Sequence, residues 1–272
     1  MTDVLRIGNA SGFYGDRLAA VQEMLEGGDL DVLTGDYLAE LTMLILGRDQ
    51  LRGSGLGYAK TFLTQIRDHL GAARDRGVAV VTNAGGLNPT GLAAAVRELD
   101  PGARVAHVEG DDLRARAADL DLVDDDRGEP LTANAYLGCW GIAAALEAGA
   151  EVVVTGRVTD ASLVVGAAAA HFGWPRDAYD ALAGATVAGH ILECGAQATG
   201  GNYAFLDEVG PLLPGFPLAE LAADGSCVVT KHPGTGGTVS VGTVTAQLLY
   251  EIGGARYAGP DAVSRFDTIE LA

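Results

Sequence analysis

The chain has 272 residues and a formal net charge of −18, and it holds only two lysines, Lys60 and Lys231. So acidic a surface repels nucleic acid and anionic membranes, and neither is expected as a partner. No apolar run reaches the length of a membrane span, and the N-terminus lacks the pattern of a signal peptide. We therefore expect a cytoplasmic protein, with residues 1–272 forming a single α/β domain.

Apolar runs of strand length alternate along the chain with segments of helical periodicity. Strands are predicted at 4–8, 31–35, 78–82, 103–110, 151–156 and 227–230. Helices are predicted at about 16–26, from 36, at 57–77, from Pro89, and at 131–149, 162–172 and 239–252. This alternation predicts a mostly parallel sheet with helices on both faces. The acidic stretch 119–130 is expected to be a solvated loop, and about 174–226 an irregular insertion beside the sheet.

Several well-known motifs are missing. No G-x-G-x-x-G follows the first strand, and the glycine-rich segment 232–240 lacks the Lys-Ser/Thr of a P-loop. The three cysteines, Cys139, Cys194 and Cys227, have no C-x-x-C spacing, which argues against a structural zinc site or a disulfide framework. No metal and no cofactor is predicted.

Polar and glycine-rich loops follow the predicted strands, where parallel sheets bind their ligands. Glycine lets the main chain approach a ligand closely, and helix N-termini attract anions. The predicted substrate-binding residues are Asn9, Ser11, Arg17, Asp36, Asn83, Gly85, Gly86, Asn88, Arg157, Gln197, Asn202 and Thr235. A simpler alternative is open for Asp16, Asp36, Asn88 and Asp160, because each stands where a helix N-cap is expected, worth about 1 kcal/mol.

Two cations directly follow predicted strands. Arg157 can hold a carboxylate or phosphate through two hydrogen bonds, and Lys231 can supply a point charge or a base. His232, next to Lys231, is a candidate acid–base group, with a solvated loop histidine as the alternative.

The run "HILECGAQATGGNYAF" (190–205) carries several reactive side chains. His190 and Cys194 share a helix face if the helix continues, which allows a thiolate–imidazole pair or a metal site. Because no third ligand has suitable spacing, a buried cysteine and an ordinary histidine are favoured. Glu193, beside an apolar run, is a better candidate for proton transfer. The predicted catalytic residues are Glu193, Asp160, Lys231, His232 and Cys194.

Seven segments, taken together and in order, resemble one known family. They are "GNASGFYGDR", "LTGDYLAELTM", "TNAGGLNP", "ANAYLG", "VVVTGRVTDASL", "ECGAQATGGNY" and "GTVTAQLLYEIG". From about residue 5 to about residue 260 the chain resembles the acyclic terpene utilisation (AtuA-like) family. The resemblance implies a place in bacterial catabolism of acyclic terpenes and branched acids through acyl-CoA intermediates, as a lyase or hydratase acting on an acyl thioester or carboxylate. It carries over no catalytic residues.

The resemblance also bears on assembly. Family members usually continue well past the end of this chain, which implies that this is the N-terminal region alone, from a split protein or a truncated form. A homo-oligomer or a complex with a C-terminal-domain partner is therefore expected. The alternative to an enzyme is a non-catalytic or partial subunit that needs this partner, and a third possibility is an acyl transferase that uses Cys194.

Overall fold

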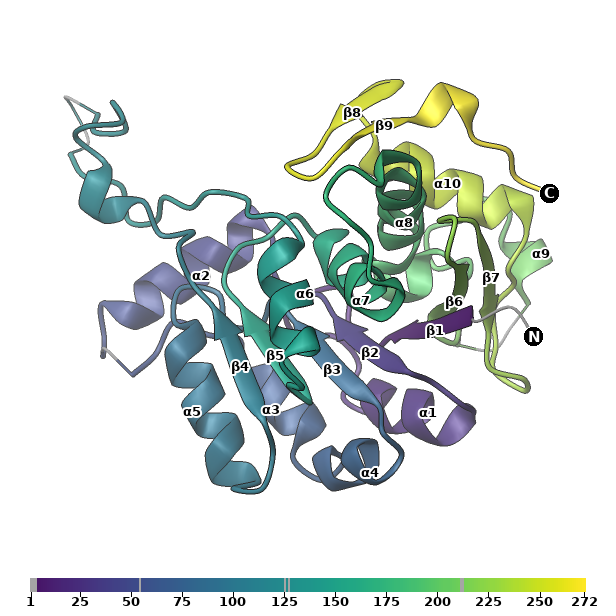
Figure 1. Cartoon of the computed structure of the whole chain (residues 1–272), viewed down its shortest axis with the longest axis horizontal. Coiled ribbons are helices and arrows are strands. Elements are labelled where there is room, and N and C mark those ends of the chain that lie inside the picture. The colour runs from purple at the N-terminus through teal and green to yellow at the C-terminus, as the bar shows by residue number, and fades with distance from the viewer. Residues whose placement is uncertain (1–3, 54, 125, 127, 211–212) are drawn as a thin grey trace.

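The computed structural model describes residues 4–53, 55–124, 126, 128–210 and 213–272. At its centre lies a seven-stranded sheet with strand order β4-β5-β3-β2-β1-β6-β7 (Figure 1). Its strands are β1 Val4–Asn9, β2 Val32–Gly35, β3 Ala79–Thr82, β4 Val105–Val108, β5 Val152–Thr155, β6 Pro217–Ala222 and β7 Cys227–Lys231. The predicted fold class, a mostly parallel α/β sheet, is confirmed.

The direction of the strands gathers their carboxyl ends at one edge. β1, β2, β3, β5 and β4 pair in parallel, whereas β6 is antiparallel to both β1 and β7. The loops that leave β1, β2, β3 and β5 therefore start from the same edge of the sheet. This edge is where the predicted polar loops were expected to meet.

Both faces of the sheet are covered by helices, because the short central strands β3 and β5 carry apolar side chains on both faces. On one face, Val80 and Val152 pack in a core with α1 (Ala20–Gly27), α3 (Lys60–Ile66), α4 (Leu70–Asp75) and α5 (Pro89–Leu99). On the other face, Val81 and Val153 pack in a core with α6 (Trp140–Glu147), α7 (Ser162–Phe172), α8 (Tyr179–Leu192) and α10 (Val241–Glu251). The sheet thus separates two hydrophobic cores.

Three predicted elements differ from the structure. The helix expected at 57–77 is divided into α3 and α4, and the helix expected at 131–149 begins only at Trp140. The segment 174–226 is not an insertion beside the sheet, because it contains α8 and β6, and β6 pairs with β1 inside the sheet. Proline at the start of β6 and Glu220 within it obscured the strand pattern, since both are uncommon in strands.

The remaining elements lie around the carboxyl edge of the sheet. They are α2 (Glu40–Gln50), α9 (Leu206–Val209), the hairpin of β8 (Arg256–Ala258) and β9 (Val263–Arg265), and 3-10 turns at Arg114–Arg116, Gly195–Gln197 and Phe266–Thr268. The β8–β9 hairpin lies over α8 (Figure 1). No helix of the described chain is long and apolar enough to cross a membrane.

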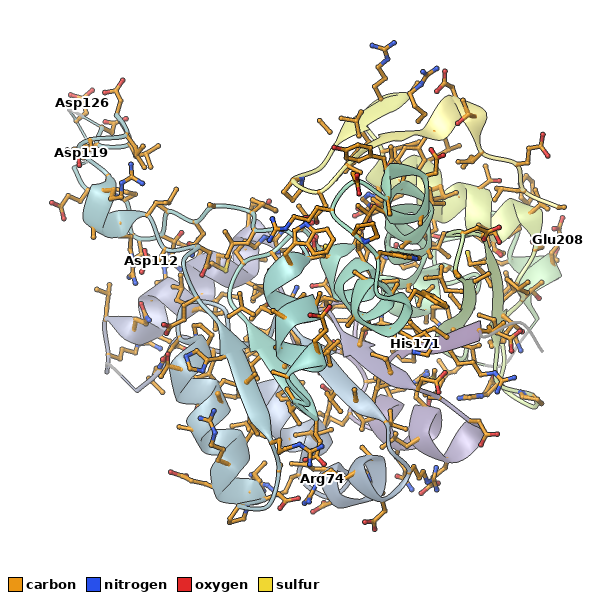
Figure 2. All side chains as sticks on the ribbon, in the orientation of Figure 1. Arg74, Asp112, Asp119, Asp126, His171 and Glu208 are labelled. Atoms are coloured by element: carbon orange, nitrogen blue, oxygen red, sulfur yellow. The ribbon has the colours of Figure 1, made fainter. Side chains whose placement is uncertain are left out.

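A separate acidic arm leads away from the sheet. Figure 2 shows Asp112, Asp119 and Asp126 along this arm, with the last two at its outer end. Most described residues of 119–130 are exposed and outside regular helices and strands, as the loop prediction required. Residues 125 and 127 of that stretch lie outside the described part of the chain.

Candidate functional site

Four carboxyl groups from distant parts of the sequence meet near the carboxyl edge of the sheet. We call them the acidic cluster: Asp36 after β2, Asp160 after β5, Glu193 after α8, and Glu251 at the end of α10. They are close enough to act electrostatically on one another. Each like charge in such a group makes the ionisation of the others less favourable.

Asp36 is held by the corner between β2 and β3. Its Oδ1 accepts hydrogen bonds from Asn83 Nδ2 (2.6 Å) and from the backbone N–H of Leu38 (3.1 Å). Asn83 Oδ1 in turn accepts from the N–H of Tyr37 (2.8 Å). Burial raises the pKa of Asp36 to about 6, against the opposing effect of these hydrogen bonds. Asp36 does not cap a helix, because α2 begins only at Glu40 and Ala39 is in the cap position.

Arg157 is a buried cation fixed on several sides. Its Nη1 lies 3.0 Å from Asp160 Oδ1 and donates a hydrogen bond to the carbonyl of Leu38 (3.0 Å). The guanidinium lies 4.2 Å from the ring centroid of Tyr136, whose hydroxyl donates to Glu40 Oε1 (2.9 Å). Bidentate recognition of a substrate anion would require Arg157 to release some of these partners.

Asp160 is the member of the cluster that combines a buried oxygen with access to solvent. About a quarter (26%) of its side chain is exposed, while its Oδ1 is buried and forms the ion pair with Arg157. Burial and the charge of Asp36 raise the pKa of Asp160 well above its ordinary value, although Arg157 opposes this shift. A carboxyl with a raised pKa suits proton transfer near neutral pH. It is not a cap either, because α7 has Ala161 at that position.

His190 and Glu193 face each other on the last turn of α8 and just beyond it. His190 Nδ1 lies 3.2 Å from Glu193 Oε1, and both side chains are 95% buried. Burial lowers the pKa of His190 to about 4, and burial together with Asp160 and Glu251 raises the pKa of Glu193. The pair is therefore not a simple ion pair, because its environment disfavours charge on both members.

Glu251 completes this side of the cluster. Its Oε1 accepts from Cys194 Sγ (2.8 Å) and from Gln247 Nε2 (3.4 Å), and Gln247 also donates to the carbonyl of His190 (3.1 Å). One ligand atom from each of His190, Glu193 and Glu251 lies within 4.8 Å of the other two. These three side chains could hold a metal ion, a set that the spacing of His190 and Cys194 had not indicated.

Close backbone packing places α8 against the two neighbouring loops. A Cβ at Gly189 would lie 2.6 Å from Ala161 Cα, and one at Gly12 would lie 2.5 Å from the carbonyl carbon of Cys194. Asn9 Nδ2 donates to the carbonyls of Leu192 (2.6 Å) and Glu193 (3.3 Å). The buried Asn9 thus positions the end of α8 rather than facing a ligand.

Other predicted substrate-binding residues in the first loop also serve the fold. Ser11 Oγ donates to the carbonyl of Phe13 (3.1 Å). Arg17 donates to the carbonyl of Pro214, pairs with Glu23 (2.7 Å) and lies over the ring of Phe216. In the described structure neither side chain is bonded to a carboxyl group of the acidic cluster, although the backbone carbonyl of Ser11 accepts from the N–H of Asp36 (2.9 Å).

The glycines and Asn88 after β3 have structural explanations. A Cβ on Gly85 would meet the carbonyl of Thr155, and Gly86 has a φ of +53°, which favours glycine. Asn88 Oδ1 accepts from the N–H of Gly91 (2.9 Å) and caps α5, with Pro89 at its first position. The capping alternative is thus confirmed for Asn88, the one of the four candidates that caps its helix.

Lys231, His232 and Thr235 form their own local structure, away from the cluster. Lys231 Nζ donates to the carbonyl of Thr235 (2.7 Å), and Thr235 Oγ1 donates to the carbonyl of His232 (2.7 Å). The His232 ring is buried against Gly27, and its Nε2 lies 2.9 Å from the carbonyl of Met24. His232 is therefore neither a solvated loop histidine nor in reach of the cluster.

The remaining residues of the 190–205 run differ in their surroundings. Cys194 follows the end of α8, and burial together with its hydrogen bond to Glu251 raises the pKa of its thiol. This environment disfavours the thiolate that a nucleophile would need. Gln197 and the exposed Asn202 bond to each other (3.0 Å).

Sequence reasoning missed Glu251, Tyr136 and Asp111. Asp111 is buried, and its Oδ2 accepts from the N–H of Arg157 (2.8 Å), which holds the β5 loop. A usable signal existed for Glu251: Thr243, Gln247 and Glu251 recur at helical spacing, so polar residues lie on the face of α10 that packs against α8.

A family model described as acyclic terpene utilisation family protein AtuA matches residues 5–272. The chain belongs to this family. Comparisons with curated proteins and with solved structures gave no match. The resemblance inferred from seven segments is therefore confirmed. Four of these segments carry the members of the acidic cluster: Asp36, Asp160, Glu193 and Glu251. The AtuA family connects the chain with the utilisation of acyclic terpenes.

Proposed function

We propose that the chain is an enzyme of branched-acid, acyclic terpene-type catabolism, a lyase or hydratase acting on an acyl thioester or a carboxylate. The single observation that carries the proposal is the state of Asp160, a partly exposed carboxyl that is ion-paired with a buried arginine and has a raised pKa. Hydration, dehydration and carbon–carbon cleavage beside a carbonyl all require a proton to be moved at or near carbon. Asp160 performs that transfer.

Arg157 positions Asp160 and limits its charge. The guanidinium is anchored by the carbonyl of Leu38 and the ring of Tyr136, so its distance to Asp160 is set by groups that do not react. The N–H of Arg157 is fixed by Asp111. A fixed cation beside the carboxylate opposes the rise in the pKa of Asp160 that burial and Asp36 cause.

An exposed apolar strip beside this site supports a hydrocarbon substrate. Leu41, Leu44 and Ile45 lie on one face of α2, and Leu41 is 68% exposed. Glu40, which begins α2, is bonded to Tyr136 over Arg157, so the helix starts next to the site. A branched acyl chain lying on this face would bury apolar surface while its carbonyl end reached Asp160.

The test measures proton exchange at carbon, which does not depend on the direction of the reaction. The protein is incubated in D₂O with branched 3-hydroxyacyl-CoA and 2-enoyl-CoA thioesters and with the free acids, and deuterium at the carbon next to the carbonyl is followed by mass spectrometry. We expect incorporation with the wild type and at least a roughly 100-fold lower rate for Asp160→Asn. The exposed Asp177→Asn is the matched control and should exchange at the wild-type rate.

Two results would contradict the proposal. Full activity of a folded Asp160→Asn variant would remove Asp160 from the proton transfer. Absence of exchange and turnover across the whole set of thioesters and acids would contradict the reaction class. Activity that appears only when a second protein is added would instead favour the subunit alternative.

A further inference from the structure

We propose that His190, Glu193 and Glu251 bind one divalent transition-metal ion. The imidazole and the two carboxyl groups come from the end of α8 and the end of α10, where the His190 ring contacts Tyr257 of β8, and each can supply one ligand atom to a common point.

The spacing of these atoms is close to that of ligands on one ion. Ligand atoms about 2.1 Å from a metal, at an angle near 100°, lie about 3.2 Å apart. His190 Nδ1 and Glu193 Oε1 are 3.2 Å apart, and the three ligand atoms lie within 4.8 Å of one another. A side-chain adjustment of about 1 Å by Glu251 would bring the set to bonding distance.

Unpartnered buried atoms in the same place supply independent evidence. His190 Nε2 and Glu193 Oε2 are buried without a hydrogen-bond partner, and their residues are 4% and 7% exposed. Gln247 Oε1, on the same side of the cluster, is also buried and unpartnered. Buried polar atoms are normally bonded, so the two unsatisfied oxygens, Glu193 Oε2 and Gln247 Oε1, indicate that a ligand belongs there, whereas His190 Nε2 is the ring nitrogen that an ion bound to Nδ1 would leave free. No donor group is bonded to these oxygens in the described structure, and a metal ion is a partner that such oxygens can bind.

The charge balance points to a cation. In the described part of the chain, Glu193 pairs only with His190, and no Lys or Arg side chain forms an ion pair with Glu193 or Glu251. Arg157, the cation of the cluster, is bound to Asp160 instead. A buried carboxylate at Glu193 beside the half-buried carboxylate of Glu251, without a counter-ion, is unfavourable, whereas a divalent ion would neutralise both.

The ligand set indicates the class of metal. One imidazole and two carboxylates suit zinc, manganese or ferrous iron, whereas magnesium and calcium favour oxygen ligands alone. Three protein ligands leave further positions open for water or a substrate oxygen. Cys194 and Gln247, both bonded to Glu251, would orient that carboxylate from behind.

Such an ion would deepen the proposed function, because it could stabilise negative charge on a carbonyl oxygen while Asp160 moves the proton. Only this catalytic role of the ion rests on the proposed function; the binding of the ion does not. Binding is measured without substrate, so the site can be present even if the proposed reaction is wrong, and absent even if Asp160 is essential.

The experiment is a titration of chelator-treated, full-length protein with Zn²⁺ and, separately, Mn²⁺ by isothermal calorimetry. We expect one ion per chain and at least a tenfold weaker affinity in Glu193→Gln and in Glu251→Gln. Glu98→Gln, an exposed position on α5 across the sheet, is the matched control and should bind as the wild type does.

A second measurement keeps the test decisive if a variant does not fold. Pulsed electron paramagnetic resonance of the Mn²⁺-loaded wild type should reveal coupling to an imidazole nitrogen. The proposal is overturned if the wild type does not bind with 1:1 stoichiometry, if folded Gln variants bind like the wild type, or if the bound Mn²⁺ has no nitrogen ligand.

Discussion

Replacing Asp36 by asparagine should make the protein more stable at neutral pH and should change how stability depends on pH. The substitution keeps an oxygen that can accept from Asn83 Nδ2 and from the N–H of Leu38, so the packing of the β2–β3 corner is retained. What it removes is the buried negative charge.

The size of the effect follows from the pKa of Asp36, which burial raises from 3.8 to about 6. Two pKa units correspond to about 3 kcal/mol. Because the folded state holds the proton more tightly than the unfolded state, the full stability contribution is present below about pH 4 and is lost as the pH rises through about 6. The free energy of unfolding of Asp36→Asn, minus that of the wild type, should therefore increase by about 3 kcal/mol from about pH 4 to about pH 7.5.

Urea denaturation at a series of pH values, in the presence of a chelator, measures this difference directly. Asp177→Asn, which removes an exposed carboxylate, is the control and should follow the wild type throughout. A difference between Asp36→Asn and the wild type that stays constant over this range would refute the reasoning, because the lost charge would then make no pH-dependent contribution.

Three further substitutions test the packing, the capping and the thiol. Gly189→Ala should lower the free energy of unfolding, measured in urea, by about 1–3 kcal/mol, because the new methyl group would collide with Ala161. An unchanged midpoint of urea denaturation would mean that α7 and α8 separate freely. Asn88→Ala should lose about 1 kcal/mol of unfolding free energy through the α5 cap, and an equal stability would show that solvent replaces the cap. Cys194→Ser keeps a donor for Glu251, so activity on an acyl thioester should stay within a few-fold of the wild type; a stable acyl adduct on Cys194 in mass spectrometry would contradict this.

The sheet could be predicted where a strand is buried on both faces. The runs around Val80 and Val153 are apolar and short, and polar turn residues stand on either side of them. A short apolar run between two turns is typical of a strand buried on both faces. β6 could not be found in this way. It carries Glu220, which pairs with Arg6 on the neighbouring strand, so its pattern reflects a partner that is distant in the sequence.

The candidate site was predicted in part, for a related reason. Asp36, Asn83, Arg157 and Asp160 follow parallel strands, and chain direction alone puts such residues at one edge. Glu251 lies on a helix, and its position depends on how α10 packs on α8 through Gln247. Lys231 also follows a strand, yet a local bond to Thr235 holds its side chain, which strand position does not reveal.

The acidic cluster joins residues from position 36 to position 251, and this has a consequence for how the protein folds. Four like-charged groups can be pressed together only after the strands near the N-terminus and the last long helix have all docked, so the most repulsive contacts are among the last to form. Folding should accordingly be faster in mildly acidic solution, where the carboxyls carry less charge, than at neutral pH. A fragment ending before α10 would lack Glu251, and with it the complete set of groups on which the site depends.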